Sequence, residues 1–399
     1  MMIKKGLFLF TVLLVFLAGC VSQEGTSPPE IAEKQPPEPI PEGILVNEIP
    51  SGADIIFTSI RYVISDMACL DEEYELKDNF VANPECNKVI YASDGGLASP
   101  RQLFSMDIET SRVVQLTNTQ DFFVNAQVVN TTTVMALAAC SDTDDNGRID
   151  EHDELELYLL DLTTGTMDCL TDDLEFSAIN NPDYSSVHEK IIFSAQQNGI
   201  FHNHLFTIDV DENLEQLTDD DDYMDFDCAW SEDGSKIVFN RLPLPIFTKP
   251  SQVWLMDADG TNPVKITDGG SDINNEGTLG QYPIGTDADP DLSPDNDKIV
   301  FSRLKTGKQN EIFGVWELVI VDVTTKTETV LDSQYANMIP EWKSKGILFV
   351  RQKSVADYIS RPMEIKQSLY RYKDGEFTEL EAYPYNIFPI GSFGGSWIE

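Results

Sequence analysis

The chain has 399 residues, of which 41% are hydrophobic and 10% aromatic, so it can bury a large core and is not a disordered protein. Sixty-eight acidic residues against 27 basic ones give a formal net charge of −41. This charge disfavours nucleic acid and anionic membrane surfaces as partners, because like charges repel. A solvated acidic exterior, divalent cations and basic partners all fit the acidity, and composition does not separate them.

The first twenty residues have the pattern of an export signal. Two lysines precede an apolar run over residues 7–17, which is too short for a permanent membrane span. The sequence Leu-Ala-Gly-Cys at 17–20 resembles a lipoprotein signal, which implies cleavage before Cys20 and a diacylglycerol on its sulfur. An ordinary secretory signal with a chance cysteine is the alternative. We therefore expect an extracytoplasmic, membrane-anchored lipoprotein, in the periplasm or at the cell surface.

Residues 21–43 are rich in Pro and Glu and predict an extended tether ahead of a folded domain over 44–399. Five cysteines follow Cys20, and in an exported protein they can be oxidised. Cys69 and Cys86 flank an acidic segment and are the pair that we expect to form a disulfide. If that bridge forms, Cys140, Cys169 and Cys228 cannot all pair with one another, so at least one of them is predicted to be a free thiol.

From residue 55 onward the chain repeats one unit. The clearest copy, residues 225–267, consists of short β-prone runs separated by turns such as Ser-Glu-Asp-Gly at 231–234. Counting this copy, its apolar run occurs seven times, at 55–59, 88–93, 133–139, 190–195, 236–241, 298–303 and 346–351. A further strand-like run follows each of the last six. A period of about 45–60 residues is near that of four-stranded propeller blades.

The two ends of the repeat complement each other. The first run, 55–59, has only the Pro-rich tether before it, whereas residues 386–399 resemble an inner strand with no partner after it. We expect the C-terminal strand to join the N-terminal blade and close the ring, because closure removes two exposed sheet edges. The predicted fold is an all-β, seven-bladed β-propeller. Six blades is the alternative, since the outer strands of the first blade, within 61–77, are poorly marked.

Three stretches carry a family resemblance: WSEDGSKIVFN at 230–240, VWLMDADGTN at 253–262 and LSPDNDKIVFSR at 292–303. They resemble repeats of the TolB-like (WD40-like) β-propeller family, and the resemblance covers most of residues 78–399. It implies a periplasmic or cell-surface propeller that binds other macromolecules, often without being an enzyme.

One insertion, SDTDDNGRIDEHD at 141–153, is similar to the calcium loop of EF-hands and dockerins. The resemblance assigns Ca²⁺ ligands to Asp142, Asp144, Asn146, the Arg148 carbonyl, Asp150 and Asp153. Gly147 would supply the sharp turn. Ca²⁺ takes six to eight oxygen ligands, and carboxylates this crowded would repel one another without a cation. The family usually has Glu where Asp153 stands, which predicts weaker binding. A solvated acidic turn is the alternative.

Other polar clusters are weaker candidates. The acidic run 219–222, with Asp225 and Asp227, is better explained as a solvated loop than as a second cation site. Asp287, Asp289 and Asp291 enter an inner strand and are candidates to face a central channel. His202 and His204 lie on one face of a strand, but no third ligand is evident, which disfavours zinc. Trp230, Trp342 and Trp397, at or near inner-strand ends, are expected in the core between blades.

No catalytic constellation stands out in the sequence. There is no G-x-S-x-G nucleophile elbow, and no glycine pattern of a Rossmann fold or P-loop follows a strand. We therefore predict a protein- or glycan-binding scaffold module at the cell envelope, with a structural calcium site. The alternative is an extracellular propeller hydrolase or lyase acting on polysaccharide or peptide, because the fold alone does not decide the function.

Overall fold

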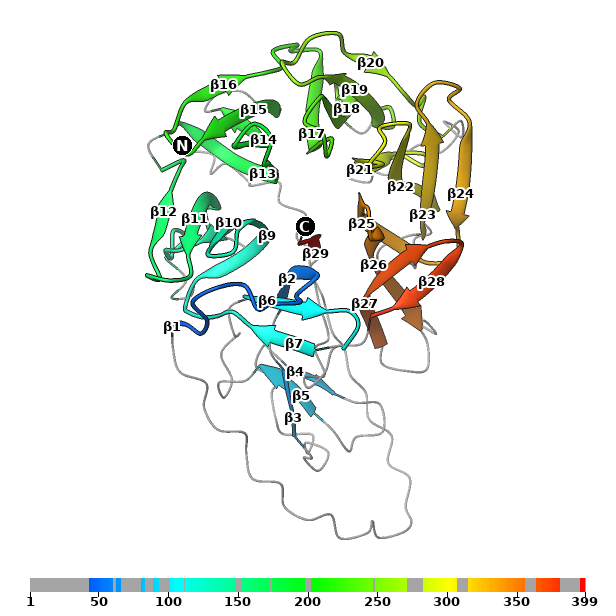
Figure 1. Ribbon diagram of the computed structural model, residues 1–399. Coiled ribbons are helices and arrows are strands. Elements are labelled where there is room, and N and C mark those ends of the chain that lie inside the picture. Colours follow the sequence, from blue (N-terminus) through cyan, green and yellow to red (C-terminus); the bar gives the residue numbers. More distant parts are fainter. Residues whose placement is uncertain are drawn as a thin grey trace, which may run out of the picture.

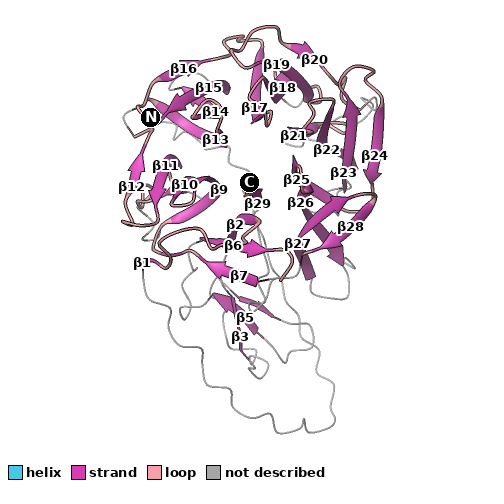
Figure 2. Ribbon diagram, viewed as in Figure 1, coloured by secondary structure: helices cyan, strands magenta, loops and turns pink. Residues whose placement is uncertain are grey.

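A computed structural model describes residues 43–59, 62–65, 80–82, 89–92, 101–110, 112–145, 147, 149, 153–172, 174–197, 202–246, 248–270, 283–306, 315–355, 364–380 and 395–398. Within these ranges all regular secondary structure is β (Figure 2). The described residues contain no helix that could cross a membrane.

The strands form six four-stranded antiparallel blades around a common axis (Figure 1). In chain order, and from the inner to the outer strand of each blade, they are as follows. Blade 1 consists of β29 (Gly395–Trp397), β2 (Ile55–Ser59), β6 (Gln102–Asp107) and β7 (Arg112–Gln115). Blade 2 consists of β9 (Phe122–Asn130), β10 (Thr133–Ala139), β11 (Glu156–Asp161) and β12 (Met167–Cys169). Blade 3 consists of β13 (Phe176–Ser185), β14 (Lys190–Gln197), β15 (His204–Asp209) and β16 (Leu214–Gln216).

Blade 4 consists of β17 (Tyr223–Trp230), β18 (Lys236–Pro243), β19 (Gln252–Asp257) and β20 (Val264–Lys265). Blade 5 consists of β21 (Asp287–Leu292), β22 (Lys298–Thr306), β23 (Val315–Asp322) and β24 (Glu328–Asp332). Blade 6 consists of β25 (Ala336–Lys343), β26 (Gly346–Val355), β27 (Glu364–Lys373) and β28 (Glu376–Glu379). A single parallel bridge between Trp316 and Ala336 links blades 5 and 6. A short ribbon pairs β1 (Gly43–Ile44) with β8 (Thr117–Asn118).

The prediction of seven blades is wrong for the described chain, and the alternative of six is what the structure shows. The apolar run at 88–93, counted as a blade, instead supplies β5 (Val89–Ala92) of a separate three-stranded sheet with β3 (Tyr62–Ser65) and β4 (Phe80–Ala82). Strand β6, which follows this run in sequence, pairs with β2, from Ile55↔Met106 to Ser59↔Gln102. The segment between β2 and β6 is therefore an insertion within blade 1.

The C-terminal strand pairs with the N-terminal blade, as predicted. The register of β29 against β2 runs from Ile55↔Trp397 to Phe57↔Gly395. Trp397 is buried in a cluster with residues of β2, β6 and blade 6. Lys345, in the turn after β25, reaches blade 1 with its Nζ 2.7 Å from Asp54 Oδ1 and 3.0 Å from the Ile398 carbonyl. Contacts from blade 6 thus hold the strand that joins the two ends of the chain.

In blades 2 to 6 the second strand contributes more buried hydrophobic residues than any other strand of its blade. The motif K-I-[IV]-F places a fully buried phenylalanine in three of these strands and the related G-I-L-F in a fourth: Phe193, Phe239, Phe301 and Phe349. Burying a side chain of this kind contributes about 2–3 kcal/mol. The clusters combine neighbouring blades, as in the one shared by blades 2 and 3. Trp230 and Trp397 lie in such clusters, as expected, and Trp342 packs against one.

The two ends of the ring differ in the length of their connections. Links from the second to the third strand of a blade, and from the outer strand to the next blade, all leave at one end, because neighbouring strands are antiparallel. The links from the second to the third strand cover residues 60–101, 140–155, 198–203, 244–251, 307–314 and 356–363. We call this end the long-connection face. The opposite end, the short-turn face, carries tight turns such as 231–235, where Gly234 adopts a φ of 69°.

Candidate metal site and interblade carboxylates

The predicted calcium loop connects β10 to β11 on the long-connection face of blade 2. The structure describes three of its predicted ligand residues, Asp142, Asp144 and Asp153, and brings a carboxylate oxygen of each within 4.8 Å of the others. Asn146, Arg148 and Asp150 lie outside the described residues. Three acidic ligands that are up to eleven positions apart in sequence are therefore gathered at one place.

Backbone geometry and hydrogen bonds shape this loop. Asp145 and Gly147 adopt left-handed conformations, with φ of 61° and 89°, which turn the chain sharply. The Gly147 N–H donates to Asp142 Oδ2 at 2.7 Å. Asp153 is only 1% exposed, and its Oδ1 accepts the Thr143 N–H at 2.6 Å. The buried end of the loop is thus tied to its exposed end.

The size of the group suits a hard cation. Calcium–oxygen bonds of about 2.4 Å place ligand oxygens on opposite sides of the ion about 4.8 Å apart. Ile149, within the same loop, packs against the core cluster between blades 2 and 3. The described part of the loop can therefore hold a divalent cation with carboxylate oxygens.

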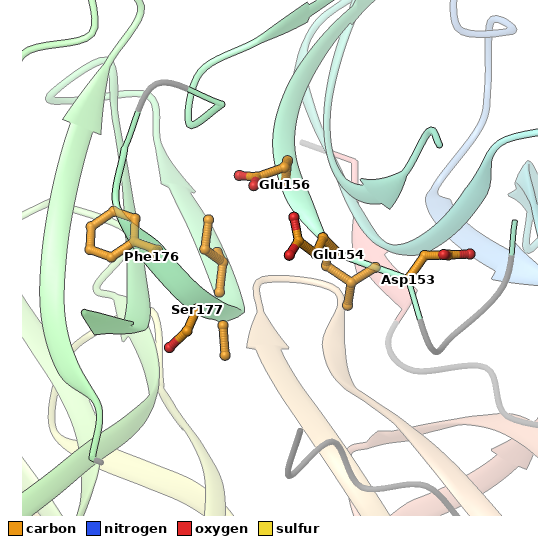
Figure 3. Close-up of a pocket in the computed structure, with 8 residues that line it drawn as sticks. Asp153, Glu154, Glu156, Phe176 and Ser177 are labelled. Carbon is orange, nitrogen blue, oxygen red and sulfur yellow. The ribbon is translucent and has the colours of Figure 1, made fainter. Parts of the chain in front are cut away.

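A small pocket lies beside the loop, between blades 2 and 3. Its lining residues are Asp153, Glu154, Leu155, Glu156 and Phe176–Ile179. Figure 3 shows the carboxylates of Glu154 and Glu156 directed toward the pocket and that of Asp153 directed away from it. The Thr171 hydroxyl donates to Glu156, while burial, together with Glu154 and Asp172, raises the pKa of Glu156. The pocket and the metal loop thus use different carboxylates.

The three aspartates predicted to face a channel have different roles. Asp287 is fully buried and forms a bidentate ion pair with Arg303, at 2.6 and 3.0 Å, so it is a structural group within blade 5. Asp225 and Arg241 form the equivalent pair in blade 4, at 2.7 and 2.8 Å. Asp289 and Asp291 instead bridge blade 5 to its neighbours.

These bridges form a repeated interblade ladder, which sequence reasoning missed. A side-chain oxygen on one inner strand accepts a backbone N–H from the inner strand of the next blade. The four equivalent bonds are Tyr184 N to Gln127 Oε1 (2.6 Å), Trp230 N to Asp183 Oδ2 (2.6 Å), Trp342 N to Asp291 Oδ2 (2.5 Å) and Trp397 N to Glu341 Oε2 (2.9 Å). The last bond connects blade 6 to blade 1.

Blade 4 breaks the pattern, since Ala229 stands at the equivalent position. Two residues earlier, Asp227 Oδ2 accepts the Asp289 N–H at 3.3 Å, and Asp289 Oδ2 in turn accepts the Ile339 N–H at 3.2 Å. Burial and the charge of Asp289 raise the pKa of Asp227, and burial raises the pKa of Asp289 to about 6. These two aspartates thus bridge blades 4, 5 and 6 in place of the missing side chain.

A local signal for the ladder exists in the sequence. Three of its carboxylates directly follow a proline, as Pro182-Asp183, Pro290-Asp291 and Pro340-Glu341. In each case the register of the inner strand shifts at the dipeptide, which marks a bulge that re-aims the side chain. A proline followed by an acid near the end of an inner strand would have identified these positions.

The described thiols agree with the prediction that at least one cysteine is free. Cys140, Cys169 and Cys228 are all free thiols. Burial raises the pKa of Cys140 to about 12, so this thiol is an unreactive, protonated group. Cys20 and the predicted pair Cys69 and Cys86 lie outside the residues whose side chains the structure describes.

Comparison with known structures identifies the fold. TolB from Acinetobacter baumannii matches with a TM-score of 0.52 and 13% identity, over 88% of this chain and 68% of that one. Kuenenia stuttgartiensis hydrazine synthase matches with a TM-score of 0.50 and 14% identity, over 88% of this chain and 47% of that one. An oligogalacturonate lyase in complex with manganese has a TM-score of 0.47 and 13% identity, over 87% and 88% of the two chains.

The chain therefore has a β-propeller fold like that of TolB, as the sequence motifs predicted. No protein-family model matches the sequence, and no curated protein does. At identities this low, the structural matches establish the fold and leave the function to the residues of this chain.

Proposed function

We propose that the protein is a lipid-anchored, extracytoplasmic propeller that binds a protein or glycan partner through its long-connection face. The observation that carries this proposal is that every long connection between described strands leaves the ring at this one end. Binding residues of propellers and barrels are concentrated on loops that a rigid scaffold positions. The opposite face consists of tight turns that offer little variable surface.

The chemistry of the long-connection face favours a protein partner with basic groups. Exposed acids on this face include Asp144, Glu154, Asp172, Asp219 and Asp221. The excess of acidic over basic residues across the chain extends this negative potential. Such a surface accelerates the approach of a positively charged partner and repels nucleic acid.

Calcium forms part of the proposal as a structural ligand. Asp142, Asp144 and Asp153 supply the described carboxylates, and Asn146, the Arg148 carbonyl and Asp150 complete the set that the loop motif assigns. The ion would neutralise the acidic loop and fix its course between β10 and β11. It would thereby support the binding face without taking part in chemistry.

The address of the protein rests on its sequence. A lipid on Cys20, followed by the tether 21–43, would hold the propeller near a membrane while it stays in solution. An extracytoplasmic address is what the resemblance of the repeat motifs to TolB-like propellers implies, and the fold is consistent with it. Growth with radiolabelled palmitate, with Cys20→Ala as the control, tests the anchor.

A pair of photo-crosslinking positions tests the binding face. Ile246 on the long-connection face and Val210 on the short-turn face are both exposed aliphatic residues, at 39% and 54%. A photoreactive amino acid at position 246 is expected to crosslink a discrete partner in intact cells, and the same group at 210 is not. Equal products at both positions, or products at 210 alone, would contradict the proposed face.

The same preparations can be tested for the alternative, a hydrolase or lyase. Purified protein is incubated with oligosaccharide and peptide mixtures. Turnover that is abolished by Glu156→Gln, in the pocket between blades 2 and 3, would replace the binding proposal with an enzymatic one. We expect no such turnover.

A further inference from the structure

A second cluster of metal-binding groups lies on the long-connection face of blade 3. His202 and His204 stand at the start of β15, and Asp221 stands in the connection from β16 to the next blade. The sequence showed the two histidines but no third ligand. The fold supplies it, because the connection that carries Asp221 leaves the ring at the same end as the start of β15.

The three side chains converge at distances that suit a bridging ion. Asp221 Oδ1 lies 3.4 Å from His202 Nε2 and 3.8 Å from His204 Nε2. One ligand atom from each residue falls within 4.8 Å of the other two. Zinc bonds of about 2.0–2.1 Å in tetrahedral geometry place ligand atoms about 3.3 Å apart. Small side-chain rotations would therefore bring all three atoms onto one ion.

The hydrogen bonding of the histidines is a second, independent observation. The His204 side chain is 97% buried (3% exposed), yet its Nδ1 has no hydrogen-bond partner. His202 Nε2 is also buried and makes no hydrogen bond, although it faces the Asp221 carboxylate. Buried polar atoms are normally satisfied, so the unbonded His202 Nε2 that faces the Asp221 carboxylate indicates an absent ligand. His204 faces the same carboxylate through Nε2, and its unbonded atom is Nδ1. The imidazole rings, 4.9 Å apart between centroids, do not bond each other either.

We infer that His202, His204 and Asp221 bind one transition-metal ion of the Zn²⁺ class, with a fourth position open to water or to an oxygen or nitrogen of a bound partner. Two imidazoles and one carboxylate are ligands that Zn²⁺ prefers, whereas Ca²⁺ takes oxygen ligands. Asp221 is 84% exposed, so the ion would be reachable from solvent. Three protein ligands with one open position bind an ion that still exchanges or activates a ligand.

The surroundings favour a cation in this place. Asp219 and Asp225 act on His204 electrostatically along with Asp221, and they add negative potential around the cluster. Asp225 itself is engaged by Arg241, which leaves Asp221 as the acidic ligand.

The experiment is titration of the chelator-treated full chain with Zn²⁺, in buffer containing millimolar Ca²⁺ so that the acidic loop 141–153 is occupied. We expect one Zn²⁺ per chain, and bound Co²⁺ should show the visible absorption of a four-coordinate site. Asp221→Asn and His202→Gln should each weaken Zn²⁺ binding at least tenfold. Asp219→Asn, a charge-matched neighbour, and His152→Gln, in the calcium loop, should change it less than threefold.

Three results would overturn the inference. They are the absence of stoichiometric Zn²⁺ binding, an effect of Asp219→Asn as large as that of Asp221→Asn, and loss of the site in His152→Gln. The exposed position of Asp221 keeps the test independent of folding, and a thermal-unfolding scan of each variant without metal verifies this. Zn²⁺ should raise the unfolding temperature of the native chain and leave that of Asp221→Asn unchanged.

Discussion

At the junctions between inner strands the bridging carboxylates are buried or half-buried and hydrogen-bonded, whereas on the long-connection face Asp144, Asp219 and Asp221 are exposed. The junctions exclude water and fix one geometry between neighbouring blades. The face gathers negative charge that only cations or a basic partner can offset. Acidic residues therefore stabilise the fold at the junctions, whereas on the long-connection face they are available to bind a ligand. Substitutions in the two regions should have separable effects.

The largest effect is expected at the junction between blades 6 and 1. Trp397 is 4% exposed, packs between these blades and donates its N–H to Glu341. Trp397→Ala should reduce the free energy of unfolding by about 3–5 kcal/mol, the usual cost of removing a large buried aromatic side chain. Chemical denaturation measures this loss. Val264→Ala, at a 52% exposed position on β20, is the control and should change stability by less than about 0.5 kcal/mol.

Glu341 should make the stability of the same junction depend on pH. Burial, partly offset by Lys343, raises the pKa of Glu341 to about 8 from 4.5. A folded-state pKa above the unfolded value means that the contribution is complete below about pH 4.5 and is lost as pH rises through about 8. Glu341→Gln keeps an oxygen for the Trp397 N–H and removes the charge. It should therefore be more stable than the native chain at pH 8.5, by on the order of 2 kcal/mol.

Denaturation at pH 5 and pH 8.5 measures the difference. Glu341→Ala leaves the Trp397 N–H without its acceptor and should be less stable than Glu341→Gln by about 1–3 kcal/mol at both values. Glu212→Gln, at an exposed position on the short-turn face, should show neither effect. Equal stability changes for Glu341→Gln at both pH values would show that the carboxyl group does not titrate in this range.

The contrast between junction and face also explains what could be predicted from sequence. The pairing of the C-terminal strand with residues 55–59 was predictable, because two unmatched pieces of one repeat were left over at the chain ends. The place of the apolar run at 88–93 outside the ring was not predictable, since β2 pairs with β6 across an insertion from residue 60 to 101. Local patterns identify strands, but they do not name the partner of a strand when the pairing is non-local.

The sites follow the same rule. Asp142, Asp144 and Asp153 belong to one contiguous motif, so sequence alone predicted that they would lie together. Asp221 is separated from His202 and His204 by an entire outer strand, and only the antiparallel course of the blade brings it back. The ladder was missed for a related reason: each of its bonds joins two blades, although the Pro-acid dipeptides mark three of its members.

On the long-connection face, removal of the metal ligands should affect stability only when calcium is present. Asp142→Ala combined with Asp144→Ala should abolish one calcium site in calorimetric titration. At calcium concentrations about 100-fold above the dissociation constant, the native chain should gain about 2.7 kcal/mol that this double variant lacks. With chelator the two proteins should unfold alike, and Asp168→Ala, at an exposed acid of the same blade, should behave as native. Undiminished calcium binding in the double variant would contradict the assignment.

The smallest change in stability is expected at an inner-strand bulge next to the junction between blades 5 and 6. Ile339 adopts a φ of 53°, a left-handed conformation that β-branched residues rarely occupy, whereas Asn181, Asp227 and Asp289 hold the equivalent bulge positions at φ of 48–50°. The left-handed conformation costs ordinary residues about 1–2 kcal/mol, and asparagine tolerates it better. Ile339→Asn should therefore stabilise the chain by up to about 1 kcal/mol in denaturation experiments. Ile320→Asn, within the regular strand β23, should destabilise it instead, because that position rewards a β-branched side chain.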